Sequence, residues 1–183
     1  MKTSLIAIAL GVLISAPALA AAPDLPDTSR TPGDTNPDVS QDTIGTTICT
    51  SGFTAGIRPN TPVTNALKRR QLSEWGYTDK TMGHYEEDHL ISLQLGGSPD
   101  SEKNLWPQHY SGKWGARTKD TLEGELKRRV CLKSPTDPDA KTDHITLKEA
   151  QDAITDDWIK AYDKYVCHRL RPALTAKIKA HCI

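Results

Sequence analysis

Residues 85–97 read YEEDHLISLQLGG and residues 104–107 read NLWP, and these two stretches decide the fold predicted for the chain. The first stretch places an acid, Asp88, directly before a histidine, His89. Four of the next six residues are apolar, and polar residues separate the later ones. This pattern predicts a strand over residues 90–95.

A hairpin follows from the glycines that end this stretch. Gly96 and Gly97 break the predicted strand, because glycine pairs mark turns. A second short segment then brings Asn104 back toward Asp88 and His89. The hairpin therefore places a carboxylate, an imidazole and an amide on one small platform.

The pattern of Asp-His, an apolar run, Gly-Gly and Asn-Leu-Trp-Pro resembles the HNH endonucleases of the His-Me finger (ββα-metal) group. It resembles most closely the small secreted bacterial HNH proteins, over residues 85–130. The resemblance implies an α+β fold, a mainly helical domain around a ββα hairpin–helix core, stabilised by disulfides. It also implies that Asp88 binds a divalent metal ion and that His89 is the general base. Asn104 would fix the hairpin and the orientation of His89.

The helix of this unit is predicted from residue 116 to about Cys131. Its buried stripe repeats at four-residue steps, at Leu122, Leu126 and Val130. Lys119 and Glu123 lie beside that stripe at 100° per residue, and Asp120 lies further round. The same geometry also allows Glu123 to be a helix-surface glutamate that pairs with Lys119 or Lys127.

The second metal ligand is less plainly marked. Many members of the family carry a final histidine on the helix as that ligand, and this chain has none clearly in that place. Glu123 is the best-placed acid, Asp120 is the second candidate, and His109, in the loop before the helix, is the third. Carboxylate ligands suit a hard ion such as Mg²⁺ or Mn²⁺.

The function implied by the resemblance is a secreted, metal-dependent endonuclease that hydrolyses phosphodiester bonds with low sequence specificity. DNA is favoured over RNA as the substrate, and no stable membrane association is expected. Lys113, Arg117 and Lys119 are candidate contacts to the nucleic-acid backbone. Two other functions compete: a catalytically degenerate nucleic-acid-binding module on the same fold, and an exported partner-binding protein whose Asp-His pair is incidental.

The chain divides into four predicted parts. Residues 1–20 read as a secretory signal peptide, with an apolar run before a small-x-small cleavage site, so the protein is expected to be exported to the periplasm or outside the cell. Residues 21–48 are a Pro/Asp-rich tether that is expected to be disordered. Residues 49–133 form the HNH nuclease core, and residues 134–183 form a C-terminal helical extension that opens at a capping box, Thr146–Glu149.

The charge of the chain is masked by the predicted tether. The whole chain carries 23 basic and 23 acidic residues. Taking away Lys2, Arg30 and the five acids of the tether leaves 21 basic and 18 acidic residues. The rest of the chain is therefore mildly basic, which permits phosphate binding without demonstrating it.

Four cysteines in an exported chain imply disulfides, and three pairings are possible. Their spacing is unlike that of a zinc site. We favour Cys49 with Cys131, which ties the start of the core to the end of its helix, and Cys167 with Cys182, a local link near the C-terminus.

Overall fold

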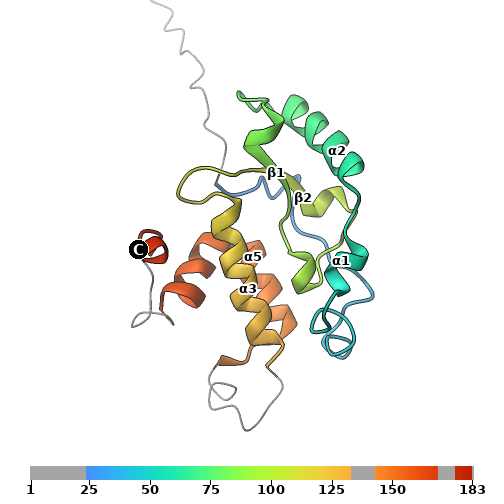
Figure 1. Ribbon diagram of the computed structural model, residues 1–183, viewed down its shortest axis with the longest axis vertical. Coiled ribbons are helices and arrows are strands. Elements are labelled where there is room, and N and C mark those ends of the chain that lie inside the picture. The colour runs from blue at the N-terminus through green and yellow to red at the C-terminus, as the bar shows by residue number, and fades with distance from the viewer. Residues whose placement is uncertain (1–23, 133–142, 169–175, 183) are drawn as a thin grey trace, which may run out of the picture.

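The computed structural model describes residues 24–132, 143–168 and 176–182 (Figure 1). The helices are α1 (Phe53–Ile57), α2 (Thr61–Glu74), α3 (Ala116–Val130), α5 (Leu147–Tyr162) and α6 (Ala176–Lys179), and the strands are β1 (Tyr85–His89) and β2 (Leu105–His109). Short 3₁₀ turns cover Met82–His84, Leu93–Leu95 and Glu102–Asn104, and a π-helical turn covers Asp163–Cys167. These helices, the small sheet and two disulfides confirm the α+β class. The predicted signal peptide lies outside the described residues.

The two strands form an antiparallel hairpin whose register runs from Tyr85 opposite His109 to His89 opposite Leu105. The strand therefore ends at the Asp-His pair, and the predicted strand over residues 90–95 is wrong. A strand would bury only every second residue, but here the apolar residues and one polar residue are buried together: Leu90, Ile91, Ser92, Leu93 and Leu95. The apolar run is a buried loop that ends in a 3₁₀ turn.

Asn104 stabilises this buried loop through its side chain. Its Oδ1 accepts a hydrogen bond from the backbone N–H of Ile91 at 2.8 Å, and its Nδ2 donates to the carbonyls of Ile91 and Ser98. Gly97 leaves the room for this contact, since a Cβ there would lie 1.7 Å from the oxygen of Ile91 and 2.8 Å from Nδ2 of Asn104. A side-chain amide thus satisfies backbone groups that a strand would otherwise pair.

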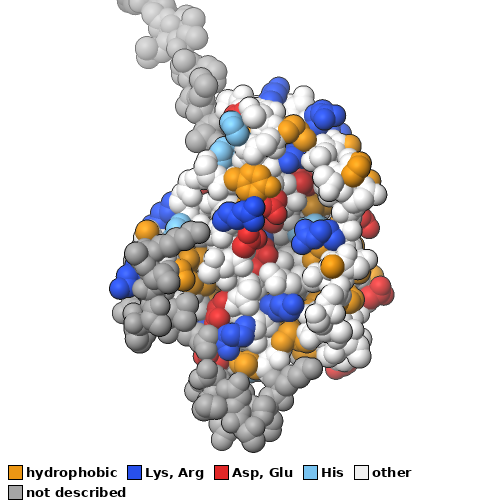
Figure 2. Space-filling model, in the orientation of Figure 1, with side chains coloured by type: hydrophobic (Ala, Val, Ile, Leu, Met, Phe, Trp, Pro, Cys, Tyr) orange, Lys and Arg blue, Asp and Glu red, His pale blue; other side chains and the backbone are white. Residues whose placement is uncertain are grey.

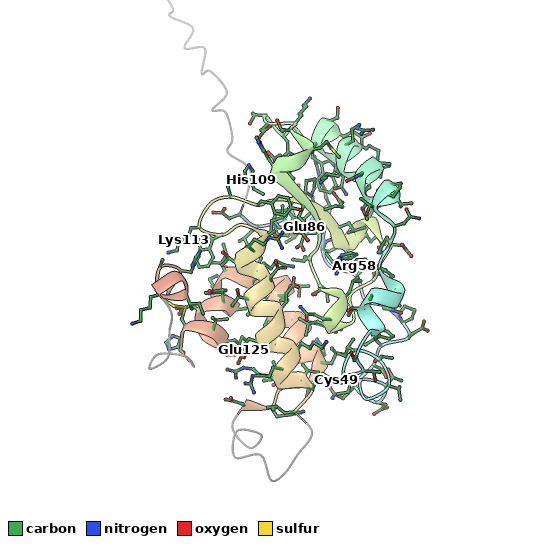
Figure 3. The ribbon with its side chains drawn as sticks, viewed as in Figure 1. Cys49, Arg58, Glu86, His109, Lys113 and Glu125 are labelled. Carbon is green, nitrogen blue, oxygen red and sulfur yellow. A yellow bond between two sulfur atoms is a disulfide. The ribbon has the colours of Figure 1, made fainter. Side chains whose placement is uncertain are left out.

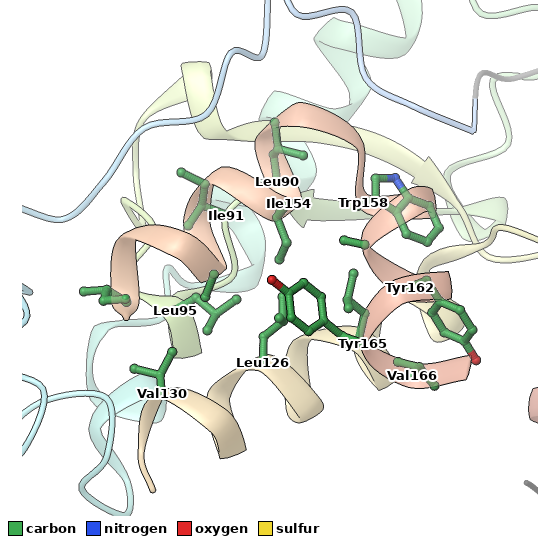
Figure 4. Close-up of a cluster of buried hydrophobic side chains, with 14 of the residues drawn as sticks. Leu90, Ile91, Leu95, Leu126, Val130, Ile154, Trp158, Tyr162, Tyr165 and Val166 are labelled. Atoms are coloured by element: carbon green, nitrogen blue, oxygen red, sulfur yellow. The ribbon is translucent and has the colours of Figure 1, made fainter. Parts of the chain in front are cut away.

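The main core lies between α3 and α5, and the hairpin and α2 lie beside it (Figure 1). The predicted stripe of α3 is confirmed, since Leu122, Leu126 and Val130 are buried. α5 begins at the predicted capping box of Thr146 and Glu149. It contributes Ile154, Trp158 and Tyr162 to the same core, as Figure 4 shows. Residues 147–162 are therefore an integral layer of the fold.

Residues 24–48, here called the N-terminal segment, pack against both the hairpin loop and α5. The prediction of a disordered tether is wrong for this segment. Thr35 forms a β-bridge with Gly97, and the backbone N–H of Gly33 donates to the carbonyl of Lys103 at 2.9 Å. The composition of the segment does not reveal this packing, because few apolar side chains take part, chiefly Val39 and Ile48. Paired backbone groups supply much of the contact.

The segment also reaches α5, which belongs to the far end of the sequence. Its Gln41 side chain accepts the first backbone N–H of α5, that of Leu147, at 2.7 Å. The indole N–H of Trp158 donates to the carbonyl of Asp24 at 3.1 Å. The N-terminal segment therefore joins the hairpin loop to α5.

Both predicted disulfides are confirmed. Cys49 is bonded to Cys131, 82 residues apart in sequence, and Cys167 is bonded to Cys182, 15 residues apart. Such bonds are typical of proteins that fold in an oxidising compartment. Among the described residues, no helix is both long enough and apolar enough to cross a membrane.

Candidate functional site

His89 is held at the end of β1 with a defined tautomer. Its Nε2 lies 2.9 Å from the carbonyl oxygen of Pro99. Because a carbonyl only accepts, Nε2 carries the proton, and the neutral ring keeps a lone pair on Nδ1. No described residue forms a hydrogen bond with that Nδ1. Burial lowers the pKa of His89 below its ordinary value, and the nearby charges of Lys119 and Arg58 lower it further. The ring is therefore a neutral proton acceptor at pH 7.

Asp88 is held by Lys119, a residue of α3. The ammonium of Lys119 lies 2.8 Å from Oδ2 of Asp88, 2.5 Å from Oε1 of Glu123 and 2.8 Å from the carbonyl oxygen of His89. Only 1% of Lys119 is exposed. The prediction that Lys119 contacts a nucleic-acid backbone is therefore wrong, because its ammonium is buried against three oxygens of the protein itself.

The second predicted metal ligand, Glu123, is fully engaged within the protein. Its Oε1 accepts from Lys119, and its Oε2 accepts from Nε2 of Gln94 at 3.2 Å. Of the alternative considered for Glu123, the i, i+4 pairing is observed, with Lys119 as the partner, but the residue is buried and not on the helix surface.

Four carboxylates lie near the ammonium of Lys119: Glu86 and Asp88 on β1, and Asp120 and Glu123 on α3. Burial raises the pKa of Asp88 to about 7, against the opposing effect of Lys119. Burial also raises the pKa values of Glu86 and Asp120, and neighbouring acids add to the effect at both positions. For Lys119, burial opposes the charge, but Asp88 and Glu123 outweigh it and raise the pKa. Both directions are expected when one ammonium serves two buried carboxylates.

This face of the molecule is mixed in charge. Figure 2 shows acidic side chains at its centre with lysine and arginine side chains around them. Figure 3 places Glu86 on the hairpin and Arg58 beside the hairpin loop. Arg58 is exposed, and among the described residues it has no ion-pair partner. No motif marks Arg58 in the sequence, because it lies in a loop 31 residues before His89.

The other predicted nucleic-acid contacts are exposed. Arg117 has 70% of its side chain exposed and lies 3.5 Å from Asp120, the second candidate metal ligand. Lys113 is exposed and lies over the ring of Trp114. Both remain available to a phosphate, unlike Lys119.

A divalent ion does not fit between Asp88 and Glu123 as these residues stand. Lys119 occupies the position between them, and both oxygens of Glu123 already have partners. An ion bound to Asp88 would lie close to a buried ammonium and would be repelled by it. The expectation that Asp88 and Glu123 jointly hold Mg²⁺ or Mn²⁺ therefore disagrees with the geometry.

A different group could hold a metal ion. Asp79, His84 and His109 place one ligand atom each within 4.8 Å of one another. His109, the third candidate ligand, belongs to this group. Its partner in the hairpin register is Tyr85, whereas His89 ends the strand four residues later. At about 3.3 Å per residue, the group lies roughly 13 Å along the hairpin from His89.

Comparisons with known proteins assign this chain to no family. No family model matches it, and no significant match was found among curated proteins or solved structures. The function of the chain is therefore inferred from the geometry of the site and from the resemblance over residues 85–130.

Glu87, next to Asp88 in β1, has a buried carboxylate whose negative charge destabilises the fold. Neither of its carboxylate oxygens, both buried, has a hydrogen-bond partner among the described residues. Burial raises its pKa to about 8, although Lys68 opposes the shift. The folded protein therefore keeps this proton at pH values where the unfolded chain, with an ordinary value of 4.5, has lost it. Stability is expected to fall as pH rises from about 4.5 to 8.

Glu87→Gln is expected to remove this penalty, because glutamine resembles the protonated acid in shape and charge. The gain in the free energy of unfolding should be roughly 1–3 kcal/mol at pH 8 and near zero at pH 4. Urea denaturation at a series of pH values measures it. Glu74→Gln, at an exposed position of α2, is the matched control, and an equal gain at both pH values for Glu87→Gln would contradict the prediction.

Proposed function

We propose that this protein is an exported endonuclease of HNH type that hydrolyses phosphodiester bonds, with His89 as the general base. The observation that carries the proposal is the orientation of His89, whose Nε2–H is fixed on the carbonyl of Pro99 while Nδ1 keeps its lone pair. A neutral imidazole with a lowered pKa is suited to accept a proton from water at neutral pH.

The hydrolysis can be written with the residues of this chain. Nδ1 of His89 takes a proton from a water molecule, whose oxygen attacks the phosphorus atom. The bond from phosphorus to the leaving oxygen breaks, and that oxygen takes a proton from solvent. Asn104 fixes the loop that follows His89, through its bonds to Ile91 and Ser98. Because Mg²⁺ or Mn²⁺ does not fit between Asp88 and Glu123, no step is assigned to a metal ion.

Substrate binding is assigned to exposed cations around the site. Arg58, Arg117 and Lys113 are exposed, and Arg58 is near enough to His89 to affect its pKa. Contacts of this kind are made to phosphates and carry no sequence information, which supports low sequence specificity. DNA remains the favoured substrate, and the predicted signal peptide and the two disulfides support export.

The test is the hydrolysis of plasmid DNA, of single-stranded DNA and of RNA by the oxidised protein, with and without added Mg²⁺ or Mn²⁺. Cleavage of at least one substrate that depends on His89 supports the proposal. Salt-dependent binding of nucleic acid without cleavage would favour the degenerate binding module instead. Neither binding nor cleavage would leave the partner-binding protein as the remaining function.

Arg58→Ala is expected to weaken substrate binding and to leave the chemical step largely unchanged, because the guanidinium contacts phosphate and transfers no proton. KM should rise by about 3–10-fold. The slope of log K against log[salt] should become shallower by about 1, as expected for the loss of one phosphate contact. Lys80→Ala removes another exposed cation and is the matched control. A rise in KM that is the same for both variants would contradict a specific role for Arg58.

A further inference from the structure

The ammonium of Lys119 is bound in the manner of a small cation. Three oxygens from three residues surround it, namely Oδ2 of Asp88, Oε1 of Glu123 and the backbone carbonyl of His89. One of these oxygens belongs to Asp88, which the HNH resemblance assigns to a metal ion, and another belongs to Glu123, the acid that helix geometry places best as the second ligand. The ammonium therefore holds β1 and α3 together at the point where a metal ion would be expected to do so.

Lys119 is also fixed in this position. It is 1% exposed and lies on α3 between buried residues of the same helix, Thr118 and Leu122. The carboxylate of Glu123 is held from its other side by Gln94. A buried lysine with two carboxylate partners stays charged, since removing the proton would leave both acids without a counter-charge. The site thus has a permanent cation of its own.

We propose that Lys119 takes the place of the divalent ion, so that the protein binds no divalent ion at Asp88 and Glu123 and acts without one there. This inference rests on the proposed phosphodiester hydrolysis. Lys119 is a positioning residue, because it holds the carbonyl of His89 and the side chain of Asp88 and is too deeply buried to touch a substrate. The negative charge of the phosphate is then stabilised by the exposed Arg58 and Arg117.

The experiment measures Mn²⁺ binding directly, by the loss of the electron paramagnetic resonance signal of free Mn²⁺. All proteins carry His84→Gln, which disables the separate group of Asp79, His84 and His109. The protein that retains Lys119 is expected to show no saturable Mn²⁺ binding at Asp88, so adding Asp88→Asn should leave its titration unchanged. Lys119→Ala is expected to gain saturable Mn²⁺ binding that Asp88→Asn removes, because two buried carboxylates lose their counter-charge. Lys127→Ala, eight residues further along α3, is the control and should bind Mn²⁺ no more tightly than the protein that carries His84→Gln alone.

The outcomes separate the two proposals. Binding by the Lys119-containing protein that Asp88→Asn abolishes would overturn the role of Lys119, and so would a folded Lys119→Ala that gains no affinity. If Lys119→Ala does not fold, as judged by circular dichroism, the Asp88→Asn comparison alone decides. Cleavage that persists in EDTA supports the inference, whereas cleavage that requires Mg²⁺ overturns it and leaves the proposed function standing. Absence of cleavage under all conditions contradicts the proposed function, and the Mn²⁺ titration still decides the inference.

Discussion

Replacing His89 with alanine is expected to lower the rate of phosphodiester cleavage by a factor of about 10²–10⁴, the usual contribution of a general base. The reason is that the lone pair on Nδ1 is lost, while Arg58 and Arg117 still bind the substrate. KM should therefore change much less than kcat. The measurement is the initial rate of cleavage of a fluorescent oligonucleotide at saturating substrate, with His144→Ala, an exposed histidine, as the matched control.

The pH dependence of the same reaction gives a second check on His89. Burial lowers the pKa of this residue, so the rate of the wild-type protein should stay high on the acidic side until the pH falls below 6.5, the ordinary value for histidine. A folded His89→Ala protein that retained more than about a tenth of the wild-type rate would contradict the assignment of the base.

Removing the disulfide between Cys49 and Cys131 is expected to produce the largest loss of stability. The bond closes a loop of 82 residues, and in the chain-entropy model such a loop contributes about 4–5 kcal/mol to the free energy of unfolding. The double variant Cys49→Ser/Cys131→Ser should lose much of that amount. Urea denaturation measures it as a lower midpoint at an unchanged slope.

The second disulfide provides the matched control. Cys167 and Cys182 are 15 residues apart, so Cys167→Ser/Cys182→Ser should cost less, about 3 kcal/mol in the same model. An equal or greater loss from the shorter loop would show that local packing near the C-terminus, and not loop closure, determines the contribution of each bond.

The parts of the fold that follow from local rules were predictable from the sequence. The stripe of α3 and the capping box of α5 depend on spacing within a single helix, and both are found in the structure. The favoured cysteine pairs rest on the positions of the four cysteines and on the predicted signal peptide. In each case the residues that determine the feature are few, and their patterns are read within one element or one residue type.

The errors arise where distant side chains replace local partners. Residues 90–95 have the alternation of a strand, but the amide of Asn104 satisfies the backbone of Ile91 and makes a buried loop possible. A lysine on a helix is usually exposed, and Lys119 is buried only because Asp88 and the carbonyl of His89 reach it from β1. Spacing within α3 placed Lys119 beside Glu123 but carried no information about β1.

The N-terminal segment has a consequence for the order in which the chain can fold. Residues 24–48 leave the ribosome early, but their partners include Leu147 and Trp158, and the Asp24–Trp158 contact spans 134 residues. This contact cannot form until nearly the whole chain has been synthesised. Folding rates fall as contacting residues become more distant in sequence, so completion of the native state is expected to be a late and slow event. During the export proposed for this chain, the polypeptide would remain open and would close only after its last long helix has emerged.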